Sequence, residues 1–160
     1  MTLLGGGTPV PDVLARLPHH RRAHFGCHGV ADPAHPSDSG LDVSGAGDLL
    51  TVSAVSRLQL DHAELAVLAA CDTARTGPVL ADEVINLASA FQLAGYRQVV
   101  GTLWPVLDTV AARLNRRVHA TVASGGLDAL PHALHAAVLD LRDRHPGLPS
   151  VWAAHLHAGR

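Results

Sequence analysis

The chain has 160 residues, the length of one ordinary domain, and its charged residues leave a formal net charge of −2 at pH 7. Apolar residues make up 48% of the sequence and aromatic residues only 3%, so leucine, valine and alanine must supply most of the core. The 12 lysines and arginines are scattered among the carboxylates, which argues against nucleic-acid binding. Neither a secretory signal nor an apolar stretch of the ~20 residues that cross a bilayer is evident, so we expect a cytoplasmic protein without a membrane partner.

The first half of the chain alternates short helical and extended segments. In chain order the pattern predicts a short helix over 11–18, a strand over 21–26, a mobile, turn-rich loop over 30–40, and a hairpin over 41–52 followed by a short helix. Pro18 is expected to end the first helix, because proline lacks the backbone N–H that a helix interior requires. Thr51 or Ser53 is expected to cap the second helix.

The second half carries the segments expected at the centre of a sheet. Residues 65–70 form an unbroken apolar run, typical of a strand buried on both faces, and residues 96–104 predict a second buried strand. The remaining pattern predicts a helix from Asp82 that stops at Gly95. Two amphipathic helices are expected next, the first with Val110, Leu114 and Val118 on one face and the second with Leu130, Leu134, Val138 and Leu141. A last strand is expected over 150–158.

Strands and helices that alternate in this order predict an α/β domain with a mainly parallel sheet and helices on both faces. Open sheets of this kind bind ligands beyond the carboxyl ends of their strands. His28 and Cys71 each stand at the carboxyl end of a different predicted strand. The predicted fold therefore allows these two side chains to meet.

Three interpretations of this pair are open. In the first, Cys71 is a nucleophile that His28 helps to convert to the thiolate. Gly29 would let the chain turn sharply, and its N–H and that of Cys71 would form an oxyanion hole. In the second, Cys71 is an ordinary buried thiol and His28 a polar residue at a strand end. The third, a zinc site of Cys27, His28 and Cys71, lacks a paired ligand spacing such as C-x-x-C.

The other histidines and cysteines are interpreted as structural. His24 is expected to be an interior histidine with its hydrogen bonds satisfied, and His155 and His157 are expected to be surface or strand residues. Cys27 and Cys71 are expected to be free thiols, because disulfides are rare in reducing compartments. No acidic cluster suited to calcium is evident, and no metal or organic cofactor is expected.

Five motifs in a fixed order resemble the CHAT domains. These are caspase-like cysteine peptidase domains of bacteria that often follow TPR repeats and are related more distantly to separase. The motifs are AHFGCHG for the histidine, LAVLAACDTA for the cysteine, ADEVINLASAFQLAG for the next helix, VVGTLWPVLD for the next strand and loop, and SVWAAHLHAG for the terminal strand. Together they span nearly the whole chain, and the fit is closest to the actinobacterial branch.

This resemblance implies a caspase-like three-layer sandwich and a catalytic dyad. By analogy Cys71 attacks the scissile carbonyl of a protein or peptide substrate, His28 transfers the proton, and the N–H groups of Gly29 and Cys71 stabilise the oxyanion. Cys27 is interpreted as core packing. Candidates for the substrate groove are Asp72, Thr73, Thr102, Trp104 and Asp108. Of these, Asp72 and Thr73 are also expected to start a turn, Trp104 to form a groove wall, and Asp108 to cap a helix that begins at Thr109.

Domains of this family commonly extend further at the N-terminus. A domain over residues 1–160 is therefore expected to lack N-terminal strands, which would leave a sheet edge exposed for self-association or for a regulatory partner. Two hypotheses follow: a cysteine endopeptidase that cuts a specific protein, and a catalytically inactive caspase-like interaction module or remnant.

Overall fold

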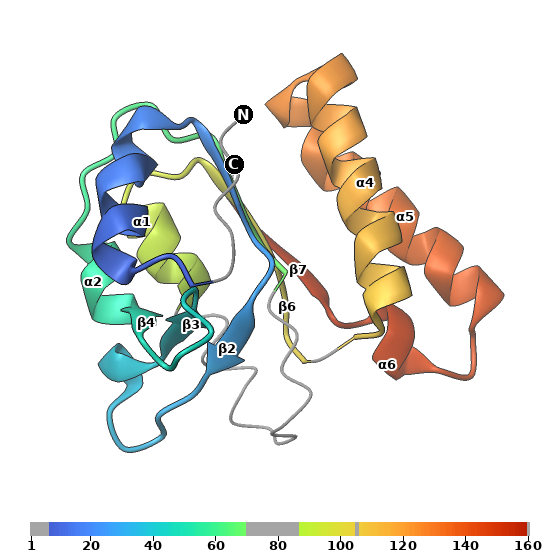
Figure 1. Ribbon diagram of the computed structural model, residues 1–160. Helices are drawn as coiled ribbons and strands as arrows, with labels where there is room; N and C mark the ends of the chain where they lie inside the picture. Colours follow the sequence, from blue (N-terminus) through green and yellow to red (C-terminus); the bar gives the residue numbers. More distant parts are fainter. Residues whose placement is uncertain (1–6, 70–86, 105, 160) are drawn as a thin grey trace.

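A computed structural model describes residues 7–69, 87–104 and 106–159, which fold into helices packed around a central sheet (Figure 1). The central sheet contains β1 (Arg22–Phe25), β5 (Leu65–Leu68), β6 (Gln98–Thr102) and β7 (His155–Gly159) in the order β1-β5-β6-β7. β1, β5 and β6 run parallel, and β7 is antiparallel to β6. The predicted α/β class with a mainly parallel sheet is therefore confirmed.

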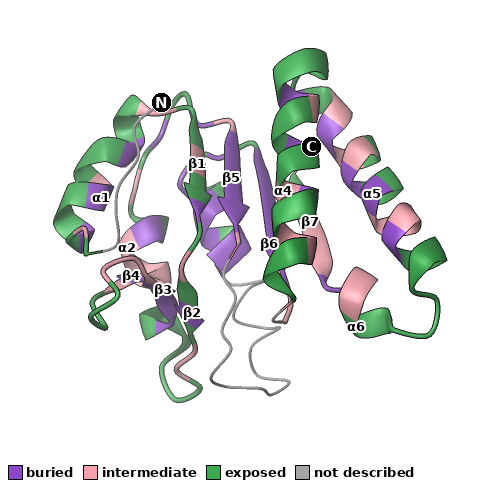
Figure 2. Ribbon diagram, turned by 45° about the vertical axis from the view of Figure 1, so that its right-hand side comes forward, coloured by how far each residue is buried: buried purple, intermediate pink, exposed green. Residues whose placement is uncertain are grey.

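Helices cover both faces of this sheet, so the domain has three layers. One face packs against α1 (Val10–Arg16), α2 (Val52–Ser56) and the helical residues 87–93, all on the left in Figure 1. The other face packs against α4 (Asp108–Gly125) and α5 (Leu130–Arg144). In Figure 2 the buried strands lie between these two layers. The arrangement is the caspase-like sandwich that the motifs implied.

The composition of β5 and β6 explains their central position. Every residue of both strands is buried, and successive residues alternate between the two cores. Ala66 and Leu68 join the core under α1 and α2, whereas Leu65 and Val67 join the core under α4 and α5. A strand that faces a core on both sides has no polar face, which is why its sequence is an unbroken apolar run. The predicted pair of buried strands is confirmed.

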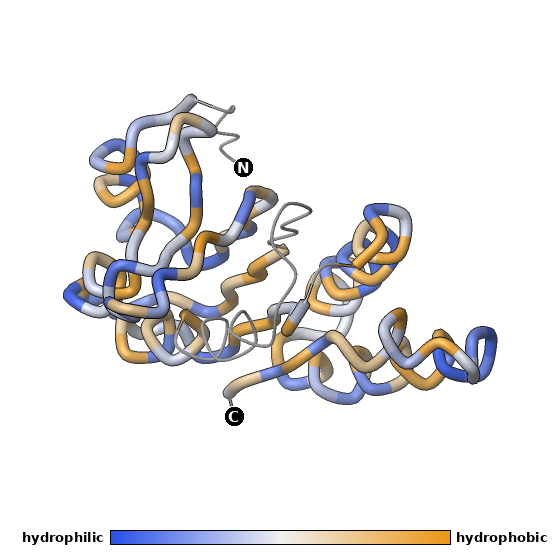
Figure 3. Tube along the Cα trace, turned by 90° about the horizontal axis from the view of Figure 1, so that it is seen from below, coloured by the Kyte–Doolittle hydropathy of each residue, from blue (hydrophilic) through white to orange (hydrophobic). Residues whose placement is uncertain are grey.

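The long helices α4 and α5 are amphipathic, and hydrophobic and hydrophilic residues alternate along the helices in Figure 3. The expected apolar positions are partly or fully buried, with Leu114, Val118, Leu130, Leu134 and Leu141 fully so. Among the described residues, no helix is long and apolar enough to span a membrane. The helix expected from Asp82 lies partly outside the described residues. Its described part ends before Gly95, as predicted, and Gly95 has a φ of 120°, which glycine adopts readily.

A second, smaller antiparallel sheet follows β1 in the chain. It contains β2 (His28–Val30), β3 (Gly40–Asp42) and β4 (Leu49–Thr51) in the order β2-β3-β4. β3 and β4 form the predicted hairpin, and Thr51 caps α2 by accepting a hydrogen bond from the Ala54 N–H at 3.1 Å. Gly40 is required here, because a Cβ at this position would lie 2.6 Å from the Leu50 carbonyl oxygen.

Two element boundaries differ from prediction. The chain does not leave its helical path at Pro18: α1 ends at Arg16 and continues as the 3-10 turn η1 (Leu17–His19), where proline is tolerated because it occupies the first turn. The strand predicted over 150–158 begins only at His155, because α6 (Pro149–Trp152) precedes it. Pro149 starts that helical turn, and its carbonyl accepts from the Ala153 N–H at 2.8 Å.

Candidate active site at the carboxyl edge of the sheet

β1 and β5, which precede the two expected dyad residues in the chain, end at the same edge of the sheet. The strands are parallel neighbours in which Phe25 pairs with Leu68, and pairing continues where the Ala69 N–H donates to the Phe25 carbonyl at 2.9 Å. His28 follows Phe25 by three residues, as Cys71 follows Leu68 by three. Cys71 itself, like Asp72 and Thr73, lies outside the described residues, so the dyad distance and the roles of these residues stay predictions.

The structure corrects the expected position of His28 and Gly29. β1 ends at Phe25, and His28 opens β2 in the small sheet rather than ending β1. Gly29 lies inside β2, buried and opposite Leu41, and its φ is not positive, so the sharp turn expected there is wrong. The chain leaves β1 at Gly26 and Cys27 instead. Extended backbone at Gly29 follows from its pairing with β3, which a tight turn would prevent.

The side chain of His28 is exposed, and its direct cross-strand neighbour on β3 is Asp42. The Asp42 carboxylate accepts hydrogen bonds from the Gly45 N–H at 2.7 Å, the Ser44 hydroxyl at 3.1 Å and the Gly47 N–H at 3.3 Å. Desolvation would raise the pKa of Asp42, but these hydrogen bonds outweigh it and lower the pKa, so the carboxylate is ionised. Asp42 thereby holds the hairpin loop that follows β3.

Cys27 is a free, half-buried thiol that packs against the core under α1 and α2. Burial, and after it the negative charge of Asp42, raise the pKa of Cys27 to about 11. A thiol with so high a pKa is almost entirely protonated at neutral pH and is a poor nucleophile or metal ligand. The interpretation of Cys27 as core packing is confirmed.

The groove candidates after β6 have different surroundings. Thr102 is buried at the end of β6, with only 7% of its surface exposed. The half-buried Trp104 ring is anchored because its Nε1–H donates to the Ser150 carbonyl of α6 at 2.9 Å. Asp108 does not cap α4: the helix already includes it, Leu107 is the N-cap, and no side chain forms a cap hydrogen bond. The exposed Asp108 carboxylate sits in the first turn, where it favours the helix through the macrodipole.

Beside this edge, a pocket with an empty volume of ≈260 Å³, part of it open to solvent, lies between the sheet and α4. Its polar lining residues are Thr102, Asn115 and His155. Val67 and Leu68 of β5, with Ala69 after them, form another wall. Both ring nitrogens of His155 are buried and have no hydrogen-bond partner within the described part of the chain. Burial is the larger influence on the pKa of His155 and lowers it, while the Trp152 backbone opposes this shift. Sequence reasoning took His155 for an ordinary strand residue and missed this environment.

His24 is not the interior histidine that the sequence suggested. It is exposed at the face of β1 toward α4, where its Nδ1 lies 2.8 Å from Nε2 of His119. The two rings stack with centroids 5.1 Å apart and an interplanar angle of 25°. β1 is exposed here because, within the described residues, it pairs with β5 alone. His119 carried no signal in the sequence, since its partner is 95 residues away.

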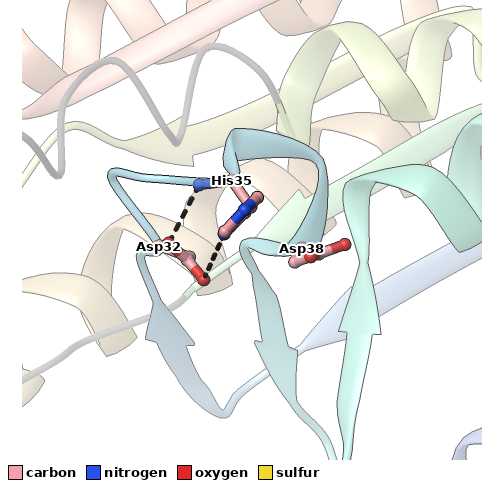
Figure 4. Close-up of side chains that lie close together, drawn as sticks. All are labelled: Asp32, His35 and Asp38. Carbon is pink, nitrogen blue, oxygen red and sulfur yellow. Dashed lines mark hydrogen bonds and ion pairs between the residues drawn. The ribbon is translucent and has the colours of Figure 1, made fainter.

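The loop between β2 and β3 brings together three side chains that the sequence did not mark as a cluster (Figure 4). One ligand atom from each of Asp32, His35 and Asp38 lies within 4.8 Å of the others. The Asp32 carboxylate accepts from the N–H groups of Ala34 and His35 at 2.9 and 3.0 Å, and the His35 hydrogen bond is the main reason that the pKa of Asp32 is lowered. These bonds by themselves explain the turns predicted for this loop.

Comparison with known proteins agrees with the geometry. The chain matches the family model of the CHAT domain over residues 10–160. A search among curated proteins found no match. CHAT domains are a caspase-like cysteine peptidase family, and the mostly parallel sheet between two helical layers is consistent with that fold. The chain therefore belongs to the CHAT domain family.

Proposed function

We propose that this protein is a cysteine endopeptidase with Cys71 as nucleophile and His28 as general acid and base. The observation that carries the proposal is the register of β1 and β5. Phe25 and Leu68 are paired on neighbouring parallel strands, and each dyad residue follows its strand's paired residue by three positions. Parallel sheets bind ligands beyond this edge, so the register supports a common site for the two side chains.

The proposed reaction begins with transfer of the Cys71 thiol proton to the His28 imidazole. The thiolate attacks the carbonyl carbon of the scissile peptide bond, and the carbonyl oxygen takes the electron pair of the broken π bond. When this intermediate collapses, the C–N bond breaks and the His28 imidazolium donates its proton to the leaving amine. Water, deprotonated by His28, then attacks the thioester carbonyl carbon; the C–S bond breaks, the carboxylic acid product leaves, and the His28 imidazolium returns the proton to the Cys71 thiolate.

The surroundings of the site fit a peptide substrate. The N–H groups of Gly29 and Cys71 are the proposed oxyanion donors, which act on charge that develops only in the transition state. Thr102 and Trp104 are the proposed groove residues after β6, and the hydrogen bond from the Trp104 indole to Ser150 supports a rigid wall.

The test is cleavage of a diverse peptide library, read by mass spectrometry, with four proteins: wild type, Cys71→Ala, His28→Ala and Cys27→Ala. We expect cuts that share one residue type at the position before the cleaved bond. These cuts should disappear in the Cys71→Ala and His28→Ala proteins. They should persist in the Cys27→Ala protein, because the Cys27 thiol of the wild type only packs against the core. Circular dichroism establishes that the variants are folded. Cuts that survive in Cys71→Ala, or no cuts by folded wild type, would refute the peptidase.

A second candidate function is a non-catalytic module that assembles through β1. The favouring observation is that β1 borders the described part of the sheet, with β5 as its neighbour there. An edge of unpaired backbone groups is a template for another strand. Sedimentation of the Cys71→Ala protein over a range of concentrations tests this function: we expect reversible self-association, and a monomer at all concentrations would exclude pairing between copies.

A further inference from the structure

The structure holds a pair of histidines away from the expected dyad that is suited to binding a transition metal. His24 on β1 and His119 on α4 approach each other with Nδ1 and Nε2 2.8 Å apart. Both side chains are exposed, so an ion can reach them from solvent. At 2.8 Å the two nitrogens share one proton, one as donor and the other as acceptor.

The separation of the two nitrogens fits a metal complex with little movement. Metal–imidazole bonds are about 2.0–2.1 Å long, so two nitrogens at right angles around one ion lie roughly 2.9 Å apart. Such angles belong to the tetragonal and octahedral geometries of Ni²⁺ and Cu²⁺, for which imidazole is a good ligand. An ion can therefore replace the shared proton once the rings tilt so that both lone pairs point to it.

The charges around the pair favour neutral imidazoles, the form that binds metals. Desolvation, and then the other imidazole, lower the pKa of His24, while desolvation and then Arg22 lower the pKa of His119. The positive charge of Arg22 is countered by Glu64, whose Oε2 lies 3.0 Å from the Arg22 Nε. On β5, the residue opposite His24 is the uncharged Val67. One turn before His119, α4 carries Asn115 and the exposed Arg116, whose charge faces solvent.

We propose that His24 and His119 form a two-histidine site for a divalent transition metal of the Ni²⁺ or Cu²⁺ type, completed by water, which fastens α4 to β1. The two ligands are 95 residues apart in the chain and meet only in the folded protein. The paired ligands give the native state a higher affinity for the ion than the unfolded chain, whose separate histidines bind it more weakly, so the ion stabilises the fold by mass action. No step of peptide cleavage passes through this site.

The experiment is calorimetric titration with NiCl2 at pH 7.5, together with thermal unfolding at rising Ni²⁺ concentration. The Cys71→Ala chain is used so that a reactive thiol does not compete for the ion. We expect one equivalent to bind and the unfolding temperature to rise with Ni²⁺. Loss of either imidazole, in His24→Ala or His119→Ala, should weaken binding at least about tenfold, since even outer-shell changes cost that much. Lowering the pH to 6 should also weaken it, because protons compete for the same nitrogens.

The matched control is the double variant His132→Ala, His135→Ala, which removes a pair of exposed histidines three residues apart on α5. Binding and the rise in unfolding temperature should persist in it. His24→Phe keeps an aromatic ring on β1 but has no ligand nitrogen, so it replaces His24→Ala in the binding test if His24→Ala does not fold. Equal Ni²⁺ affinity in the Cys71→Ala parent and in its His24 and His119 variants would overturn the proposal, as would loss of the thermal shift in the α5 control alone.

Discussion

At the scale of single residues, two cysteines of one chain are expected to differ strongly in reactivity. The thiol of Cys27 has a pKa of about 11 because it is half-buried and lies near the negative charge of Asp42. At neutral pH it holds on the order of a hundredfold less thiolate than an ordinary cysteine. A nucleophilic Cys71 next to an imidazole has the opposite character. Under the proposed function, the same residue type would serve packing at position 27 and chemistry at position 71.

We predict that iodoacetamide labels one cysteine rapidly at pH 6–7 and that this cysteine is Cys71. Peptide mapping of the labelled protein measures the two rates separately. The Cys27→Ala protein should keep the fast phase, and the Cys71→Ala protein should lose it. Labelling of Cys27 should accelerate only as the pH approaches 11. Equal rates at the two sites in folded protein would contradict both the burial of Cys27 and the activation of Cys71.

At the scale of secondary-structure elements, β7 begins with a histidine whose ring nitrogens are buried. His155 pairs in register with Thr102 of β6, and its ring nitrogens are buried without a partner in the described chain. A buried polar group left unsatisfied costs about 1–3 kcal/mol, and the described residues supply no partner for these nitrogens. Because the pKa of His155 is lowered, the native protein resists protonation there, whereas the unfolded chain takes up a proton below about pH 6.5.

We predict that the free energy of unfolding falls as the pH is lowered from 7 to 5. A group whose native pKa is depressed stabilises the fold fully above its unfolded pKa and loses that contribution as the pH falls through the native pKa. His24, His119 and His157 share this direction with His155, since desolvation lowers the pKa of each. Urea denaturation at a series of pH values measures the slope.

The variant His155→Leu isolates the contribution of this residue. Leucine fills the same space without polar atoms, so we expect stability at pH 7 to rise by about 1–3 kcal/mol and the loss toward pH 5 to become shallower. The exposed His132→Leu on α5 is the matched control and should change neither quantity much. A destabilised His155→Leu protein with an unchanged pH slope would mean that the His155 nitrogens have a partner that stabilises the fold.

At the scale of the whole molecule, stability depends on two cores separated by one sheet. Phe91 is fully buried in the core under α1 and α2, with ring centroids 5.2 Å from Phe25 and 5.5 Å from Tyr96. Leu130 is fully buried in the other core, under α4 and α5. Because β5 and β6 contribute side chains to both, neither helical layer is dispensable for the sheet.

We therefore predict large and comparable losses from truncating a side chain in either core. Phe91→Ala should cost about 3–5 kcal/mol and Leu130→Ala about 2–5 kcal/mol, which are large fractions of a domain's total stability. Chemical denaturation measures both, and the exposed Leu93→Ala is the control for a leucine outside the cores. A Leu130→Ala protein as stable as wild type would show that the layer of α4 and α5 is loosely attached.

Local sequence patterns determined most of the elements. The unbroken apolar runs marked β5 and β6, the spacing of Leu114 and Val118 marked one face of α4, and the hydroxyls of Thr51 and Ser53 marked the start of α2, where Thr51 is the cap. These signals lie within a few residues of the structure that they specify, so periodicity and capping chemistry are enough to read them. The order of the motifs also identified the family before any contact was known.

Only the tertiary structure decided which distant residues meet. The sequence placed His28 at the end of β1, but pairing with β3 makes it the first residue of a second sheet, opposite Asp42. Nothing local marks His119 as the neighbour of His24, or His155 as a residue that lines one pocket with Asn115 and has buried ring nitrogens. These relations arise from packing across tens of residues. Short-range pattern determined the elements of this protein and the identity of its family, whereas sheet register and helix packing decided the neighbours of these histidines.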